Sequence, residues 1–414
     1  FVADVPAGRP LGVLLGANAI SLAGNAIAAL AVPWFVLQTT GSATQTGIVG
    51  FFAILPVVLS SFFGGGLVDR LGYKRASIIA DVASGLTVAA IPALHAIGAL
   101  TFPVLLALAF LGALLDAPGA TARRALLPEL SARAGWPLER ATSAAQVAER
   151  GARLIGAPAA GLLVALFGPS EVLWIDAASF AISALMVALL VPGPGPAPAP
   201  QRAGYMRELL EGLRFIRGDA PIAAILLVLL VTNFLDSAWF AVTAPVYAEE
   251  MYRSAAALGL LFGATAGGSV AGALVYGAFG VRWPRRPVFV ADFVVAASQL
   301  ILLAMFPPLW AAVAICALAG FGAGPLNPII AAVSLERIPP LARGRVLGAL
   351  TGVGFLAMPL GALVAGPLLT AVGLRTVLLL AGGLYLLTTL SLVANPAIRA
   401  MDDRRDPTAA APRA

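Results

Sequence analysis

The chain has 414 residues, of which 60% are apolar and only 11% are charged, and its mean hydropathy is +0.94. Because water-soluble domains carry about 25% charged residues, this composition argues against the soluble enzyme classes. Basic residues outnumber acidic ones by 26 to 20, but almost all of them lie in short connections between apolar stretches. We therefore expect them to set membrane orientation, with no role in nucleic-acid binding.

Apolar runs of about 20 or more residues, bounded by charges, Pro or Gly, are long enough to cross a hydrocarbon core about 30 Å thick. The sequence predicts twelve such spans, at 11–38, 44–68, 76–98, 102–122, 141–167, 171–191, 222–248, 255–280, 287–306, 309–333, 345–371 and 374–396. The expected fold class is therefore an all-α polytopic membrane protein.

The positions of the basic residues predict the orientation of these spans. An even number of spans places both termini on one side of the membrane, and the connections rich in Lys and Arg face the cytoplasm. Of the 26 basic residues, 22 lie in the termini or the even-numbered connections, with Arg345 at the first residue of the eleventh span counted among them, and Arg253 and Arg375 lie in odd-numbered ones. Both termini are thus predicted to be cytoplasmic.

The middle connection divides the chain into six spans and six spans. Its segment Pro192-Gly-Pro-Gly-Pro-Ala-Pro-Ala-Pro200 cannot continue a helix. The next segment, 205–217, has apolar residues at helical spacing among charged ones, which predicts an amphipathic helix on the cytoplasmic membrane surface. We expect an N-terminal six-helix bundle at 1–191, a cytoplasmic linker at 192–220, a C-terminal six-helix bundle at 221–400 and a cytoplasmic tail at 401–414.

The two halves also repeat each other at a nearly constant offset. Four pairs are related by 205 residues: Arg140 and Arg345, Gly156 and Gly361, Gly161 and Gly366, and Gly168 and Gly373. Near the second and eighth spans the offset is 207, as for Gly65 and Gly272. The repeat predicts two parallel bundles related by an axis along the membrane normal, with a central site between them.

The turn between the second and third spans carries the most specific motif, Gly65-Gly-Leu-Val-Asp-Arg-Leu-Gly-Tyr-Lys-Arg75. Its glycines permit a tight turn, and an acid beside a helix end can pair with Arg or a positive dipole end. This run resembles the G-x-L-x-D-R-x-G-[RK]-[RK] signature of the major facilitator superfamily. The resemblance implies that a gating latch between the halves is formed by Gly65, Asp69, Arg70, Gly72, Lys74 and Arg75. A simple orienting loop would explain the basic residues but not Asp69.

A second resemblance, over 116–130 and 141–156, is to the macrolide and multidrug efflux branch, which includes siderophore exporters. Gly151, Gly156, Pro158 and Gly161 resemble the fifth-helix motif of drug:proton antiporters. This resemblance implies export of a small-molecule substrate coupled to protons. Small residues also allow helices to pack closely in lipid whatever the protein carries, and that explanation remains open.

Ionisable groups inside spans are the main candidates for function, because burial of a charge costs about 2.5 to 3.5 kcal/mol on insertion scales. Asp236 lies near the centre of the seventh span, with Asn233 and Phe240 on the same helical face and Trp239 nearby. We expect Asp236 to exchange a proton and these neighbours to contact substrate. A hydrogen-bonded structural Asp is the alternative.

The fifth span carries a second polar stripe, Gln146, Glu149 and Arg153, with Arg150 adjacent. Glu149 and Arg153 stand at i and i+4, where an ion pair is natural. We treat Glu149 as a candidate proton-coupling group and Gln146 as a candidate substrate contact.

Asp116 of the fourth span is the third candidate proton-coupling group, and it could pair with Arg123 or Arg124. Asp176 and Asp292 lie nearer span ends, where solvated or capping roles are expected.

Four further polar residues are candidate substrate contacts: Asn18, Ser21 and Asn25 share a face of the first span, and Asn327 lies in the tenth. The family resemblance implies that spans one, four, seven and ten surround the cavity. Hydrogen bonding between helices explains these residues equally well.

The sequence thus predicts a proton-coupled exporter of amphipathic small molecules or drugs that works by alternating access. Alternatives are a transporter of one solute, such as a siderophore or lipid-like molecule, and a membrane sensor without flux. With one His and one Cys and no Walker motif, we expect no enzyme, metal or cofactor. We expect a monomer in a prokaryotic cytoplasmic (inner) membrane, with substrate, protons and the lipid bilayer as its partners.

Overall fold

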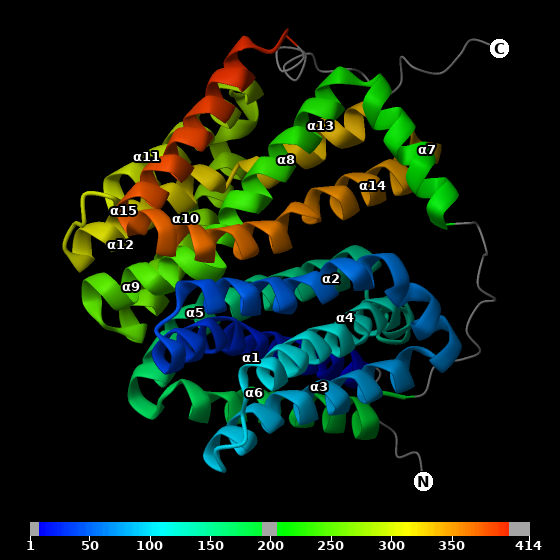
Figure 1. Cartoon of the computed structure of the whole chain (residues 1–414). Coiled ribbons are helices and arrows are strands. Elements are labelled where there is room, and N and C mark those ends of the chain that lie inside the picture. Colours follow the sequence, from blue (N-terminus) through cyan, green and yellow to red (C-terminus); the bar gives the residue numbers. More distant parts are fainter. Residues whose placement is uncertain (1–7, 193–204, 397–414) are drawn as a thin grey trace, which may run out of the picture. The chain divides into compact units, whose positions relative to one another are not determined.

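A computed structural model describes residues 8–192 and 205–396, apart from the side chains of 61–67, 69, 70, 153, 205, 206 and 281. All regular structure in this part of the chain is helical (Figure 1). The chain divides into two compact units. The N-terminal unit comprises Phe1–Gln201 and Ala244–Leu260, and the C-terminal unit comprises Arg202–Thr243 and Leu261–Ala414.

Six long helices make up most of the N-terminal unit: α1 (Arg9–Thr40), α2 (Ala43–Leu71), α3 (Tyr73–Ala96), α4 (Phe102–Arg133), α5 (Leu138–Phe167) and α6 (Pro169–Leu190). The short α9 (Ala244–Tyr252) and the first residues of α10 belong to the same unit. Local signals set the boundaries: Gly41 ends α1 with a left-handed conformation, and the Ser42 hydroxyl then caps α2 by accepting from the Gln45 amide.

The C-terminal unit contains the linker helix α7 (Tyr205–Gly218) and a series of further helices: α8 (Ala220–Ala238), η1 (Trp239–Thr243), most of α10 (Ala255–Phe279), η2 (Gly280–Arg282), α11 (Arg285–Leu303), α12 (Leu309–Ala323), α13 (Leu326–Arg337), η3 (Pro340–Ala342), α14 (Arg343–Phe355) and α15 (Ala357–Ala394). The element η1 is a π-helical turn. There the Thr243 hydroxyl donates to the carbonyl of Ala238, five residues earlier.

Eleven helical runs among the described residues are long and apolar enough to cross a membrane. The last run, Pro340–Ala394, has 55 residues. At about 1.5 Å per residue it would be roughly 80 Å long, which is enough for two spans. Gly373 divides it with a φ of 80° and a ψ of 162°, so the helices supply twelve spans.

The same backbone conformation recurs at the matching position of the first half. Gly168 separates α5 from α6 with a φ of 88° and a ψ of 154°. Only glycine adopts this region readily. The sequence pairing of Gly168 with Gly373 therefore corresponds to the same backbone device in each half.

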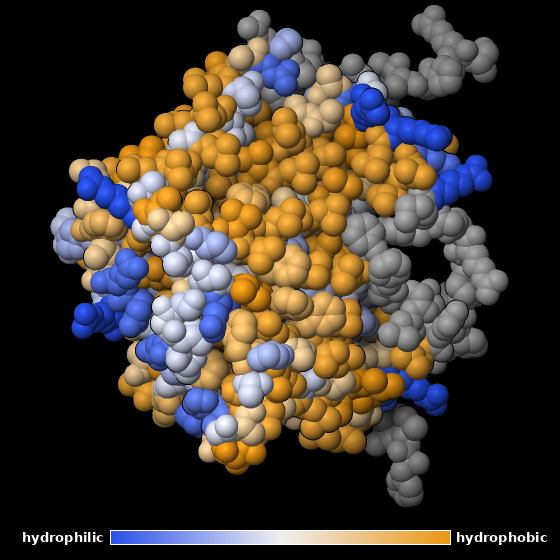
Figure 2. All heavy atoms as spheres, in the orientation of Figure 1, coloured by the Kyte–Doolittle hydropathy of each residue, from blue (hydrophilic) through white to orange (hydrophobic). Residues whose placement is uncertain are grey.

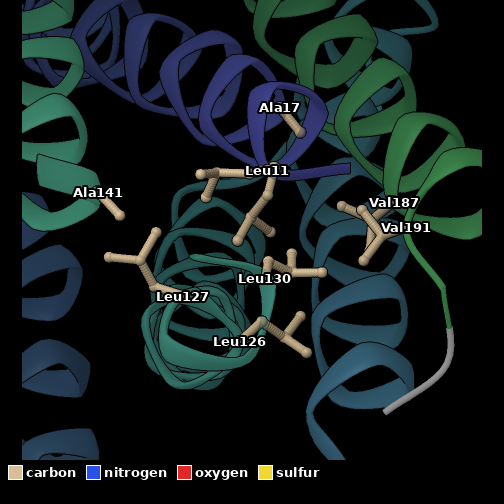
Figure 3. Packing of buried hydrophobic residues seen from close by; sticks show 9 residues of the cluster. Leu11, Ala17, Leu126, Leu127, Leu130, Ala141, Val187 and Val191 are labelled. Carbon is tan, nitrogen blue, oxygen red and sulfur yellow. The ribbon is translucent and has the colours of Figure 1, made fainter. Parts of the chain in front are cut away.

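The helices combine a packed interior with an apolar exterior. Figure 3 shows part of the N-terminal interior, where Leu126 and Leu130 of α4 meet Leu11 of α1, Val187 of α6 and Val191 just after α6. Figure 2 shows hydrophobic residues spread over broad stretches of the helix surfaces and hydrophilic ones gathered toward helix ends. Such extensive apolar exposure is expected of helices that face lipid.

The linker helix α7 packs part of its apolar face against α14, while Leu210 on that face stays exposed. Gly212 approaches the α14 backbone so closely that an added Cβ would lie 2.5 Å from the carbonyl oxygen of Arg345. Ile216 is buried, and Glu211 accepts from the Arg345 guanidinium at 2.7 Å. Part of the apolar face of α7 is therefore used to pack against α14.

Candidate functional site

A buried polar network joins α1, α3, α4 and α6 of the N-terminal unit, with the Arg123 guanidinium at its centre. Arg123 is 3% exposed, and its Nη1 donates to Asp81 Oδ1 at 2.6 Å. Its Nε donates to Asn18 Oδ1 at 3.0 Å, and its Nη2 donates to Ser21 Oγ at 3.5 Å. Two of the predicted substrate contacts thus bind a predicted ion-pair residue.

Asp116 lies at the edge of this network. Its Oδ2 accepts from the Asn25 amide at 2.9 Å, and its Oδ1 lies 3.8 Å from Arg123 Nη2, too far for a hydrogen bond. Among the described residues, that Oδ1 atom has no hydrogen-bond partner. The side chain of Asp116 is 23% exposed. The expected pair of Asp116 with Arg123 is therefore present only as a loose contact.

Sequence reasoning missed the residue that binds Arg123 most tightly. Asp81 of α3 is fully buried, and its second oxygen accepts from the Ser183 hydroxyl of α6 at 2.7 Å. A usable signal existed, because an ionisable residue inside an apolar span is a candidate for function wherever it occurs. Its partner could not be read from the sequence, since Asp81 and Arg123 are 42 positions apart.

The expectation that Asp176 and Asp292 have solvated or capping roles is wrong, because both are buried and neither stands at a helix end. Asp176 is fully buried in α6, and Asp292 of α11 is 6% exposed. Gly24 of α1 packs directly over Asp176 and Ser179, leaving no room for a Cβ. Nearness to a span end in sequence does not ensure contact with water when a neighbouring helix crosses that end.

The stripe on α5 is more open than the Arg123 network. Gln146 and Arg150 are exposed, and Glu149 Oε2 lies 3.5 Å from Nη2 of Arg124, whose side chain is 75% exposed. The side chain of Arg153 lies outside the described residues. The predicted ion-pair residue Arg124 thus has a carboxylate partner on α5.

The turn between α2 and α3 is described only in part. Gly72 separates the helices with a φ of 76°, as the motif's tight turn requires. Lys74 donates to the carbonyl of Ala188 near the end of α6 at 2.9 Å, and Arg75 is exposed. The side chains of Asp69 and Arg70, and the surroundings of Gly65, lie outside the described residues.

In the C-terminal unit, Asp236 of α8 accepts a hydrogen bond at Oδ1 from the Tyr385 hydroxyl of α15 at 2.7 Å. Asp236 is exposed whereas Tyr385 is buried, and no Lys or Arg of the described chain forms a salt bridge with this carboxyl. Asn233, one turn earlier, donates to the carbonyl of Gly354 at 2.9 Å. Tyr385 is a second residue that sequence reasoning missed.

Of the remaining candidates in this unit, Trp239 and Phe240 belong to the π-helical turn η1, and Asn327 lies apart from it. Trp239 is buried, whereas Phe240 is 40% exposed and meets Phe262 edge to face at 5.1 Å. π-helical turns inside α-helices occur frequently at functional sites. Asn327 is exposed near the start of α13.

Comparison with known proteins agrees with this architecture. The family model of the Major Facilitator Superfamily matches residues 14–252 and 226–412. Multidrug efflux pump Tap of Mycobacterium tuberculosis is 34% identical over 398 residues, or 95% of each chain. Macrolide efflux protein A of Streptococcus pyogenes is 23% identical over 376 residues, or 89% of this chain and 91% of that one.

Solved structures of transporters share the fold at low sequence identity. The nucleoside transporter NupG superposes with a TM-score of 0.76 at 13% identity, covering 93% of this chain and 98% of that one. A POT family transporter gives a TM-score of 0.70 at 11% identity, covering 93% and 95%. The prediction of an all-helical, twelve-span transporter fold is thereby confirmed: this multi-pass membrane protein belongs to the Major Facilitator Superfamily.

Proposed function

We propose that this protein is a secondary exporter of amphipathic small molecules, including drugs, that exchanges them for protons by alternating access. The names of its efflux-pump relatives support the substrate class. Proton coupling is supported by carboxyl groups inside apolar helices. A carboxylate in an apolar membrane-spanning helix is costly to keep ionised, so such a group is expected to bind a proton in part of the transport cycle.

The observation that carries this proposal is the environment of Asp236. The Asp236 side chain lies on an apolar helix and is nevertheless exposed. The Tyr385 hydroxyl donates a hydrogen bond to it, and no Lys or Arg of the described chain forms a salt bridge with it. A hydrogen bond from Tyr385 orients one oxygen and leaves the other to accept a proton. Asp236 is therefore the first proton-coupling group of the proposal.

The N-terminal unit supplies the other two proton-coupling groups. Asp116 has one oxygen without a hydrogen bond, beside Arg123 at 3.8 Å. Glu149 forms a long contact with Arg124, and both side chains reach solvent. An exposed pair of this kind contributes little to stability, so Glu149 can leave Arg124 when it binds a proton.

Amide, hydroxyl and aromatic groups near these carboxyls are the proposed substrate contacts: Asn18, Ser21, Asn25 and Gln146 in the N-terminal unit, and Asn233, Trp239, Phe240 and Asn327 in the C-terminal unit. Aromatic surface with a few polar groups is typical of sites that bind amphipathic molecules. Phe240, which presents part of its ring outward, is the best placed of these for an apolar substrate.

The basic turn is the proposed gate. Lys74 already binds a carbonyl near the carboxyl end of α6, where a cation is favourable. Gly65, Asp69, Arg70, Gly72 and Arg75 complete the proposed latch, with both termini and this turn on the cytoplasmic side of a prokaryotic inner membrane. The direction of transport then brings protons inward as substrate leaves.

Transport driven by an imposed proton gradient in reconstituted vesicles tests the proposal, with radiolabelled erythromycin as a macrolide probe. We expect Asp236→Asn and Asp116→Asn to lose at least about 90% of gradient-driven accumulation and to retain exchange of labelled for unlabelled probe. Glu171→Gln, which changes an exposed acid at the start of α6, should behave like the unmodified protein.

The same vesicles distinguish the alternatives. Competition by chemically unrelated amphipathic compounds supports a multidrug exporter, whereas competition by one compound class alone indicates a single-solute transporter. Unchanged gradient-driven accumulation in both Asp variants would overturn the assignment of the carboxyls. Absence of any flux across a panel of amphipathic probes would favour a sensor.

A further inference from the structure

Asp81 has no role in the proposed function so far, although both of its carboxyl oxygens accept hydrogen bonds. Its Oδ1 accepts from Arg123 at 2.6 Å and its Oδ2 accepts from Ser183 at 2.7 Å. The side chain is fully buried. Both oxygens are thus held by hydrogen bonds, one from α4 and one from α6.

The consequence of this arrangement is seen at the neighbouring carboxyl. Arg123 gives one hydrogen bond to Asp81 and another to Asn18, which fixes the plane of its guanidinium. In that position the nearest approach to Asp116 is 3.8 Å, without a hydrogen bond. A shift of about 1 Å would convert this contact into a normal charged hydrogen bond.

Helix packing brings Arg123 to Asp81 in the first place. Gly119 of α4 lies against α3, where an added Cβ would be 2.8 Å from the Cβ of Ala80 and 3.7 Å from Asp81 Oδ1. The close approach of α4 to α3 at Gly119 places Arg123, one turn later, directly on Asp81. The tight pair with Asp81 and the loose pair with Asp116 therefore result from the same contact.

We propose that Asp81 is a positioning residue for proton binding at Asp116. By holding Arg123, Asp81 keeps the guanidinium from forming a close ion pair with Asp116, so that Asp116 can bind and release a proton during the transport cycle. The inference rests on the proposed function, in which Asp116 couples proton entry to export.

Charge balance gives the physical reason. Asp81 and Asp116 share one guanidinium, so the group carries a net negative charge until Asp116 binds a proton. At 3.8 Å Arg123 already favours the ionised form of Asp116, the negative charge of Asp81 acts against it, and a hydrogen-bonded ion pair with Arg123 would favour ionisation further. If Arg123 were released to Asp116, the closer ion pair would keep Asp116 ionised to lower pH and would hinder its proton exchange.

Titratable and polar groups on every helix near Asp116 contribute to the electrostatic environment of its carboxyl. The residues are Asn25 on α1, Asp81 on α3, Arg123 on α4, Glu149 and the exposed Arg150 on α5, and Asp176 on α6; the side chains of Asp69 and Arg70 on α2 and of Arg153 on α5 lie outside the described residues. Glu149 contacts Arg124, and Asp176 has no salt bridge in the described chain. The nearest charge that can change partner is Arg123.

Two substitutions should move proton binding in opposite directions. Asp81→Asn keeps the shape and the Ser183 contact but removes the competing charge, so we expect the pH midpoint of erythromycin transport to fall by about 1 unit or more. Asn18→Asp adds a second carboxylate that competes for Arg123, at the position where Asn18 Oδ1 lies 3.0 Å from Arg123 Nε. Because Asp116 then has a weaker hold on Arg123, the pH midpoint of erythromycin transport should rise. Asp81→Glu retains the charge and should restore a midpoint near that of the unmodified protein.

An infrared titration of the purified protein separates this inference from the proposed function. The carboxyl band that is absent in Asp116→Asn reports protonation of Asp116 without any transport. Opposite shifts of this band in Asp81→Asn and Asn18→Asp support the positioning role, even if transport proves independent of protons, in which case only the proposed function fails.

Unchanged midpoints in both variants would overturn the inference and leave Asp81 as a structural partner of Arg123. If Asp81→Asn does not fold, the infrared titration of Asn18→Asp alone tests the inference. A higher pH midpoint of the Asp116 carboxyl band supports the inference, and an unchanged or lower midpoint rejects it. A monodisperse peak in size-exclusion chromatography establishes folding before either titration.

Discussion

Replacement of Arg123 by Gln should destabilise the protein far more than replacement of its neighbour Arg124. Arg123 and Asp81 are 3% and 0% exposed, and their charged atoms are 2.6 Å apart. Removing one partner leaves a buried charge without compensation, which costs about 3 to 5 kcal/mol. Arg123→Gln is therefore expected to lower the free energy of unfolding by that amount.

Arg124→Gln provides a matched control on the next residue of the same helix. The Arg124 side chain is 75% exposed, and its contact with Glu149 is 3.5 Å long. Exposed pairs contribute about 0 to 1 kcal/mol. Equilibrium unfolding in mixed micelles with increasing SDS, followed by circular dichroism, measures both variants under the same conditions.

The double variant Arg123→Gln, Asp81→Asn tests the cause of the loss. Because it removes the uncompensated carboxylate as well, it should recover at least about half of the stability lost in Arg123→Gln. Equal losses in Arg123→Gln and Arg124→Gln, or a double variant less stable than Arg123→Gln, would refute the reasoning.

Two further predictions concern the C-terminal unit. Gly361→Ala should lower the free energy of unfolding by about 1 to 3 kcal/mol, because an added Cβ meets the backbone carbonyl of Phe234; Gly277→Ala, which has open space around it, should stay within about 1 kcal/mol in the same SDS titration. The hydrogen bond from Arg207 lowers the pKa of Glu211 below its ordinary value of 4.5, and Arg345 lowers it further. This contribution to α7 docking is complete above pH 4.5 and is lost as the pH falls through the lowered pKa. Because Gly212 and the buried Ile216 also hold α7 against α14, spin labels on the two helices should show an unchanged distance at pH 5 and at most a small population at longer distance in stronger acid, which should be absent in Glu211→Gln. A longer distance already at pH 6 would contradict this.

The sequence predicted the spans well because lipid imposes a simple rule. A helix must be apolar along about 20 residues, so the predicted span at 141–167 corresponds to α5 at Leu138–Phe167. The pairing of Gly168 with Gly373 could also be found in the sequence, because each position has a positive φ that favours glycine.

Contacts between helices were less predictable, because they depend on how each helix is rotated and how closely it packs. The sequence showed Asp116 one to two turns before Arg123, yet the backbone at Gly119 directs Arg123 to Asp81 on another helix. Tyr385 reaches Asp236 across 149 positions, and no local pattern marks such a pair. The candidate carboxyls could thus be listed from sequence, but not their partners.

Proton movement driven by substrate alone tests the central claim most directly. Sealed proteoliposomes with a pH-sensitive dye inside receive a gradient of erythromycin and no ion gradient. We expect the internal pH to change as protons move opposite to the macrolide, independently of sodium, and we expect no change in a protein carrying both Asp116→Asn and Asp236→Asn. Movement of macrolide at an unchanged internal pH would contradict the account.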